Sequence, residues 1–173
     1  LVANATLSKQ GEGPMVTEKQ GLAGFDGYAK LSLLDADRKV RDVLAGRLSD
    51  LKAKVHECSQ KARSEGREKL LSEIDTIERR LSRLRDMTAF HEGSYIPPYT
   101  KQGISRIDTK SLNDIDGRLE TLIEDAYGMI SDLSCAEKDL NIIAKLSAIS
   151  GILRNYESEL NARSILLKQE LKH

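Results

Sequence analysis

The stretch that decides the fold is IDGRLETLIEDAYGMISDLSCAEKDLNII, residues 115–143. Its apolar side chains recur at steps of four and three residues, the spacing that places them along one side of an α-helix. We call such a row a seam. This one consists of Ile115, Leu119, Leu122, Ala126, Met129, Leu133, Ala136, Leu140 and Ile143. Because a seam is buried only against another helix, the stretch predicts an all-α protein.

Similar seams occupy most of the remaining chain. After one slip in phase, the C-terminal seam continues at Leu146, Ile149, Leu153, Tyr156, Leu160, Leu167 and Leu171. An earlier seam comprises Leu44, Leu48, Leu51, Val55, Cys58 and Ala62, followed in a shifted phase by Leu70, Ile74, Ile77, Leu81, Leu84 and Thr88. Residues 31–90 and 113–172 contain no proline, which favours long helices because proline interrupts the helical hydrogen bonds.

We therefore predict one helical domain over residues 31–173, with helices at 31–90 and 113–172 and a tip loop at 91–112. Each helix would span roughly 90 Å at 1.5 Å per residue. Similar lengths favour a long antiparallel hairpin, like a coiled coil. A compact four-helix bundle with breaks near Gly66 and Ser134 is the alternative, because Gly66 stands at the shift in phase and Ser134 begins a capping-box match.

Opposite charges support this hairpin register. If Phe90 lies near Asn113, Arg80 faces Asp125 and Arg85 faces Asp116. One like-charged pair arises in the same register. Because an exposed pair stabilises a helix by only about 0.3–0.5 kcal/mol, these charges indicate how the helices align and say little about stability.

The apolar stripe is wider than a single seam, and a wide stripe requires more than one neighbouring helix. We therefore expect a homo-oligomer, with a dimer favoured. The 27 basic and 27 acidic side chains cancel, so nucleic acid is disfavoured as a partner. Membrane association is possible, but no basic amphipathic stretch supports it. No apolar run approaches the roughly 20 residues of a membrane-spanning helix.

The sequence offers little for catalysis, so we expect no enzyme, no catalytic or metal-binding residues and no cofactor. His56 and Cys58 are two positions apart, which directs them to nearly opposite sides of a helix and prevents them from sharing a metal. The glycines near the N-terminus are spaced too loosely for a phosphate-binding loop and precede no strand.

Two segments differ from the helices. Residues 1–30 contain five glycines between positions 11 and 27 and are expected to form an extended or poorly ordered arm. The tip contains the run Tyr95-Ile96-Pro97-Pro98-Tyr99, in which proline stiffens the backbone and tyrosine supplies a side chain common at binding hot spots. We predict these five residues as a candidate partner-binding site. The alternative is a cap that covers the end of the helices.

These observations favour a non-enzymatic interaction or assembly protein of the scaffold type, which self-associates through its helices and contacts a partner at the tip. A peripheral membrane protein is the alternative. We expect a cytoplasmic location. Because the chain begins at Leu1, a processed or exported product stays open.

Overall fold

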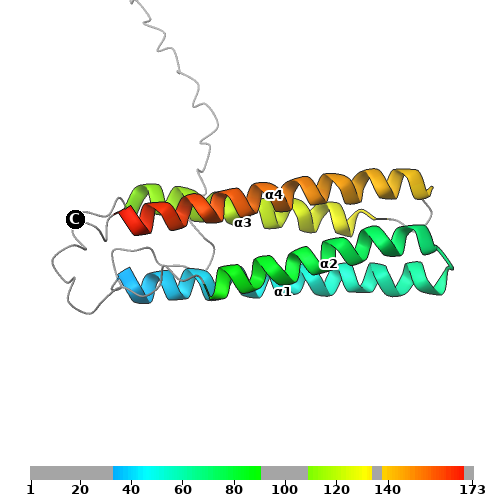
Figure 1. Ribbon diagram of the computed structural model, residues 1–173, viewed down its shortest axis with the longest axis horizontal. Coiled ribbons are helices and arrows are strands. Elements are labelled where there is room, and N and C mark those ends of the chain that lie inside the picture. The colour runs from blue at the N-terminus through cyan, green and yellow to red at the C-terminus, as the bar shows by residue number, and fades with distance from the viewer. Residues whose placement is uncertain (1–32, 91–108, 134–137, 170–173) are drawn as a thin grey trace, which may run out of the picture.

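The computed structural model describes residues 33–90, 109–133 and 138–169, and its regular structure there consists of helices (Figure 1). The helices are α1 (Leu33–Ser64), α2 (Glu68–Ala89), α3 (Thr109–Ser131) and α4 (Asp139–Gln169). The all-α prediction is thus confirmed for the described residues. The predicted arm at 1–30 and the candidate contact residues Tyr95–Tyr99 lie outside them.

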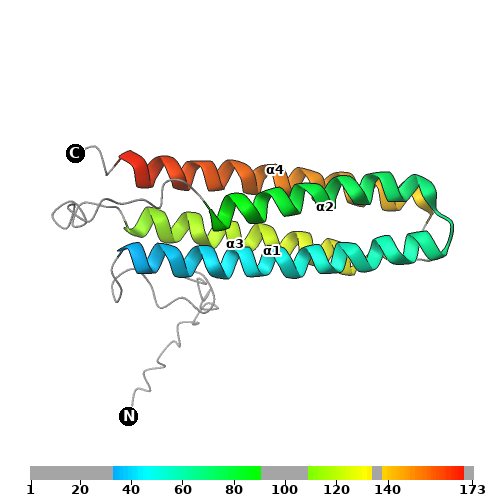
Figure 2. The same cartoon turned by 60° about the horizontal axis from the view of Figure 1, so that its bottom comes forward.

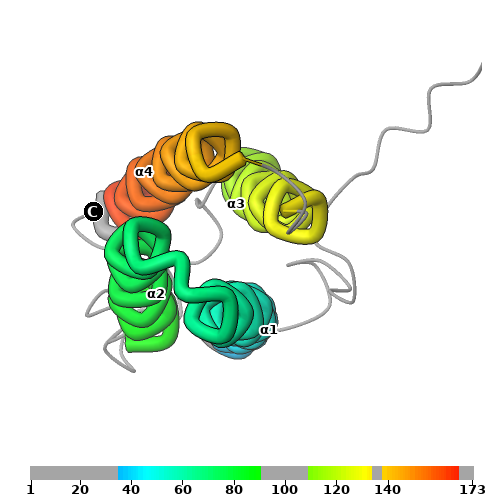
Figure 3. Tube along the Cα trace, turned by 90° about the vertical axis from the view of Figure 1, so that its right-hand side faces the viewer, coloured from blue at the N-terminus to red at the C-terminus, as the bar shows by residue number. Residues whose placement is uncertain are grey.

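The four helices form two antiparallel hairpins, α1 with α2 and α3 with α4, which lie side by side (Figures 1 and 2). Viewed end-on, the helices stand at the corners of a square in which α1 contacts α2 and α3, and α4 contacts α2 and α3 (Figure 3). The pairs α1/α4 and α2/α3 therefore lie across the two diagonals. Neighbours from different hairpins, α2 with α4 and α1 with α3, run in parallel.

The turn between α1 and α2 has the hydrogen bonds of a Schellman motif, the common way for a helix to end at a glycine. Arg67 N donates to Ala62 O (2.9 Å) and Gly66 N donates to Arg63 O (3.2 Å). Gly66 has a φ of +67°, a value that glycine adopts without the steric penalty of a side chain. The unbroken helix predicted for residues 31–90 is therefore wrong, and the break near Gly66 that belonged to the alternative is present.

The helix predicted for residues 113–172 is also interrupted, since α3 ends at Ser131 and α4 begins at Asp139. One consequence is that α2 and α3 do not lie flank to flank. A wide apolar stripe requires more than one neighbouring helix. Because each long segment folds back on itself, a single chain supplies these neighbours.

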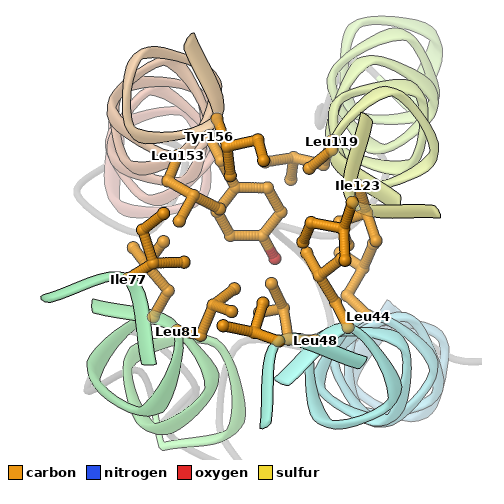
Figure 4. Close-up of a cluster of buried hydrophobic side chains, with 14 of the residues drawn as sticks. Leu44, Leu48, Ile77, Leu81, Leu119, Ile123, Leu153 and Tyr156 are labelled. Carbon is orange, nitrogen blue, oxygen red and sulfur yellow. The ribbon is translucent and has the colours of Figure 1, made fainter. Parts of the chain in front are cut away.

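The core of the bundle is filled by leucine and isoleucine from all four helices, with Tyr156 among them (Figure 4). In α2 the predicted seam from Leu70 to Thr88 is confirmed, because all six of its residues are buried. In α3 the buried face is partly displaced from the prediction. The predicted seam residues Ile115, Leu119 and Ala126 are buried, and so are Leu112, Asp116, Glu120, Ile123 and Ile130.

The displacement in α3 has a packing cause. The helix contacts α1 on one side and α4 on the other, so the centre of its buried face lies between the two contacts. Leu122 and Met129 are consequently only half-buried. The predicted seam residue Leu140, in the first turn of α4, is 78% exposed.

The predicted charge pairs between α2 and α3 are not formed, because these helices lie on a diagonal. Arg80 donates to the backbone oxygen of Ser150 on α4 (3.2 Å), and Arg85 donates to Asp86 on its own helix. Asp116 accepts from Arg163 on α4, and Asp125 is exposed. Charges instead join α2 to α4 through Arg83 and Glu157, and α1 to α3 through Arg47 and Glu120.

Candidate functional site: a buried charged layer

Near one end of the bundle the core changes from apolar to charged. Two acidic and two basic side chains lie in the buried rows of three helices. They are Asp37 and Arg41 on α1, Asp116 on α3 and Arg163 on α4, with exposed fractions of 3%, 9%, 1% and 3%. We call these four residues the charged layer. Apolar side chains lie on both sides of it along the helices, so the layer is part of the core and not its rim.

Arg163 is the centre of the layer. Its Nε donates to Asp116 Oδ1 (2.6 Å), and its Nη1 donates to Asp37 Oδ1 (2.6 Å). The other oxygen of Asp37, Oδ2, accepts from Arg41 Nε (2.9 Å). Arg41 Nη1 then donates to the backbone oxygen of Ala89 at the end of α2 (2.9 Å). The layer therefore connects all four helices.

The energetics of the layer follow from its charge balance. Removing one ion from water costs several kcal/mol even after relaxation, so a buried charge is tolerated only when it is paired and hydrogen-bonded. Here two positive and two negative groups balance, and the planar guanidinium of arginine can serve two acceptors at once. The contact with Ala89 adds a further stabilising term, because the last carbonyls of a helix lack intrahelical partners and carry partial negative charge.

A neutral hydrogen bond joins α2 to α4 in the same region. The hydroxyl of Tyr156, whose side chain is 1% exposed, lies 3.0 Å from Thr88 Oγ1. Thr88 Oγ1 also donates to Leu84 O (2.8 Å). Since a hydroxyl has one proton to donate, Tyr156 must be the donor to Thr88. Burial raises the pKa of the Tyr156 hydroxyl to about 12.

The charged layer lies at the end of the bundle where α2 finishes and α3 begins (Figure 2). Residues 91–108, which contain the predicted contact residues, must connect these two diagonal helices there. Phe90, the last described residue before this segment, is 80% exposed. The two helix ends that this segment joins, at Phe90 and Thr109, thus lie at the end of the bundle that contains the layer.

Of the four residues in the layer, only Asp116 was predicted from the sequence to form an ion pair, and with a different partner. Asp37, Arg41 and Arg163 were not predicted. A signal was present, because continuing the steps of four and three without requiring apolar residues leads from Leu44 to Arg41 and Asp37, and from Leu160 to Arg163. These polar residues interrupt the apolar spacing on which the predicted seams are based.

The described residues hold no group of three histidine, cysteine or carboxylate side chains that could bind a metal ion. His56 lies at the surface, where its Nδ1 is 3.2 Å from Glu78 Oε1, and Cys58 is partly buried. The charged side chains of the layer bind one another: each forms a hydrogen bond or ion pair with a group on another helix of the same chain.

Comparison with known proteins gives no assignment: no protein-family model, no curated protein and no solved structure matches the chain. Within the described ranges, no helix is both long enough and apolar enough to cross a membrane.

Proposed function

We propose that the chain is a non-enzymatic interaction protein of the assembly or scaffold type, whose bundle holds residues 91–108 in place for a partner. Tyr95, Ile96, Pro97, Pro98 and Tyr99 are the proposed contact residues. The observation that supports this proposal is the charged layer, which connects all four helices at the end where that segment is attached.

Buried ion pairs affect which helix arrangement forms more than they affect stability. They contribute little net stability compared with apolar residues of the same volume, and their best-attested role is to favour one arrangement of helices over others. A segment attached to helices that are fixed in this way has restricted ends. It loses less conformational entropy on binding than a segment between mobile helices, and the stiff Pro97-Pro98 backbone reduces that loss further.

The structure changes the basis on which self-association is proposed. The apolar rows that suggested a homodimer are filled within one chain, as the complete burial of Leu44, Leu81 and Leu119 illustrates. Packing of intact seams between two copies is therefore no longer required. Self-association remains part of the proposal, now as an exchange of one helix between two copies of the chain.

The proposal is tested by comparing three full-length chains: the wild type, a Tyr95→Ala/Tyr99→Ala variant, and Tyr127→Ala as a matched control. Tyr127 is a surface tyrosine on α3, 38% exposed. Proteins captured from cell extract would be quantified for each chain and then purified for calorimetric titration. We expect a partner whose affinity falls at least about tenfold in the double variant and stays unchanged in the control. Equal binding to all three chains would refute the assigned contact.

Flotation with vesicles that contain anionic lipid distinguishes an interaction protein from the alternative, a peripheral membrane protein. An interaction protein of the proposed kind stays at the bottom of the gradient. Flotation of the wild-type chain that high salt abolishes would support the membrane alternative instead, because lipid-surface attraction is electrostatic and screened by salt.

A further inference from the structure

The turn between α1 and α2 has a property that distinguishes it from an ordinary connector. Gly66 alone among the described residues has a positive φ. The positions Ala62, Gly66 and Leu70 are spaced by four and four residues, and Ala62 and Leu70 are both buried. If the turn were helical, the buried rows of α1 and α2 would therefore continue on nearly the same side of one helix, with a local change of winding that helices tolerate.

The same end of the bundle also carries apolar surface that the described helices and turn do not cover. Leu140 in the first turn of α4 is 78% exposed. A cavity of about 320 Å³ lies beside the turn, and its apolar walls include Ala62, Leu70, Ile130 and Ile142. We call this part of the molecule the turn end.

We propose that a second copy of this chain can supply α1 to the bundle, giving a dimer in which residues 65–67 are straightened and the two copies exchange their first helices. This deepens the proposed function, on whose self-association it rests. The turn ends of the two bundles then face each other, which places each Leu140 near the partner copy.

The exchange is energetically reasonable because it breaks few contacts. Apart from the hydrogen bonds of the turn itself, the contacts that α1 makes with the other helices are made again between copies, including Arg41 with Ala89, and Asp37 with Arg163. The difference in free energy between closed monomer and exchanged dimer is therefore concentrated in the turn, in the newly apposed turn ends and in the entropy of association.

Contacts at the turn favour the closed monomer. The two Schellman hydrogen bonds require the left-handed conformation at Gly66. Arg67 Nε also donates to Asp139 Oδ1 at the start of α4 (2.8 Å), which holds the beginning of α2 against the other hairpin. Gly66 is consequently the residue whose conformational preference sets the balance between the two states.

The first test is Gly66→Ala in the full chain. Alanine is disfavoured at a φ of +67° and favoured in a continuous helix, and no atom within 4 Å of the added Cβ would clash with it. Each dimer contains two such positions, so we expect the dimer association constant to rise by about a hundredfold or more. Light scattering after size-exclusion chromatography over a range of concentrations measures this change.

Gly46→Ala is the matched control. Gly46 lies on the exposed side of α1, and the space around it is also open. The substitution gives the same gain in helix propensity away from the turn. We therefore expect a higher melting temperature with no change in the association constant.

The second test shows which helix is exchanged. His56→Cys and Glu78→Cys are introduced with Cys58→Ala and Cys135→Ala, because the side chains of His56 on α1 and Glu78 on α2 are in contact at 3.2 Å. The ends of these long side chains touch, whereas a disulfide requires Cβ atoms about 4 Å apart, so the two thiols are joined by a short bifunctional maleimide cross-linker. In an exchanged dimer the cross-link joins two chains, so the protein migrates as a dimer on a denaturing gel. In a closed chain it migrates as a monomer.

Two results would overturn the inference: Gly66→Ala staying monomeric at the highest concentration, or a dimer with cross-links only within chains. If Gly66→Ala does not fold, the cysteine pair is examined in chains with Gly66 retained and refolded at high concentration. Cross-links between chains should then increase with concentration, and their absence would equally overturn the inference. Neither test alters Tyr95 or Tyr99, so failure here is distinguishable from failure of the proposed partner contact.

Discussion

Arg163 on α4 reaches Asp37 on α1 across a diagonal of the bundle, with 2.6 Å between Nη1 and Oδ1. The same guanidinium donates to Asp116 on the neighbouring α3. The Arg163 side chain thus contacts both the helix diagonally opposite, α1, and the adjacent helix, α3. Because these hydrogen bonds are short and directional, they are satisfied only when the helices occupy particular corners.

Arg163→Leu should be strongly destabilising. It leaves Asp116 buried without its charge partner and removes one of the two partners of Asp37. Truncating a buried ion pair typically lowers the free energy of unfolding by about 3–5 kcal/mol. Urea denaturation measures the loss. The control is Arg118→Leu, since Arg118 is 54% exposed and pairs with Glu159 at the surface; its loss should be about 1 kcal/mol or less. Equal losses would show that the charged layer is not effectively buried.

Combining Asp116→Leu with Arg163→Leu should restore much of that stability. Both members of a buried pair are then replaced by apolar side chains, a change that is often neutral or stabilising, while Asp37 keeps Arg41 as its partner. We expect the free energy of unfolding to return to within about 2 kcal/mol of the wild type. The amide NMR spectrum should show extra or broadened peaks, since a device that specifies one helix arrangement has been removed. A single sharp set of peaks would contradict the role in specificity.

Thr88→Val should destabilise the bundle by about 1–3 kcal/mol, because it leaves the buried hydroxyl of Tyr156 without a hydrogen-bond partner. Adding Tyr156→Phe removes that hydroxyl and should recover part of the loss. Thr121→Val is the matched control, since Thr121 is exposed and bonds only to Gly117 O in its own helix. If the Tyr156→Phe change brings no recovery in the Thr88→Val background, the two hydroxyls are not coupled.

The raised pKa of Tyr156 predicts a loss of stability at high pH. The hydroxyl titrates at about 12 in the folded chain and near its ordinary value of about 10 when unfolded. Its contribution is therefore fully present below pH 10. Above that, the unfolded chain gives up the proton first, so stability falls by about 1.4 kcal/mol per pH unit until the folded pKa is reached.

Denaturation of the wild type and of Tyr156→Phe at about pH 9 and about pH 11 isolates this contribution from other titrating groups. The stability advantage of the wild type should shrink by about 1.4 kcal/mol between the two pH values. An advantage that does not change with pH would mean that Tyr156 is ionised as easily in the bundle as in water.

Tyr95→Ala with Tyr99→Ala should lower the melting temperature by no more than about 2 °C, less than the shift expected for a loss of 1 kcal/mol in a chain of this size. The proposed role of these tyrosines is contact with a partner, which does not stabilise the isolated chain. Differential scanning calorimetry distinguishes this role from the cap, which predicts a large decrease because core residues would become exposed.

Particular residues show how far the sequence could be interpreted. In α2 every apolar seam position is buried as predicted, because the row contains one apolar residue at each step and no competing row. In α3 the buried face is broader than the predicted seam, and it includes Asp116 beside the predicted Ile115 and Leu119. Asp116 is acceptable in the core because Arg163 lies opposite it. That compensation comes from a residue 47 positions away and has no local signature.

The sequence alone determined that the described chain is helical, which residues of α2 are buried, and that Gly66 is a place where a helix can end. These properties depend on local periodicity and on the conformational freedom of single residues. Only the tertiary structure decided that the turn at Gly66 closes, that α2 lies beside α4 and not α3, and that Asp37, Arg41, Asp116 and Arg163 meet in one buried layer. Apolar rows of leucine and isoleucine attract one another without regard to direction, so they do not specify which helices become neighbours. Directional contacts between distant residues distinguish one arrangement from another, and those contacts exist only once the chain has folded.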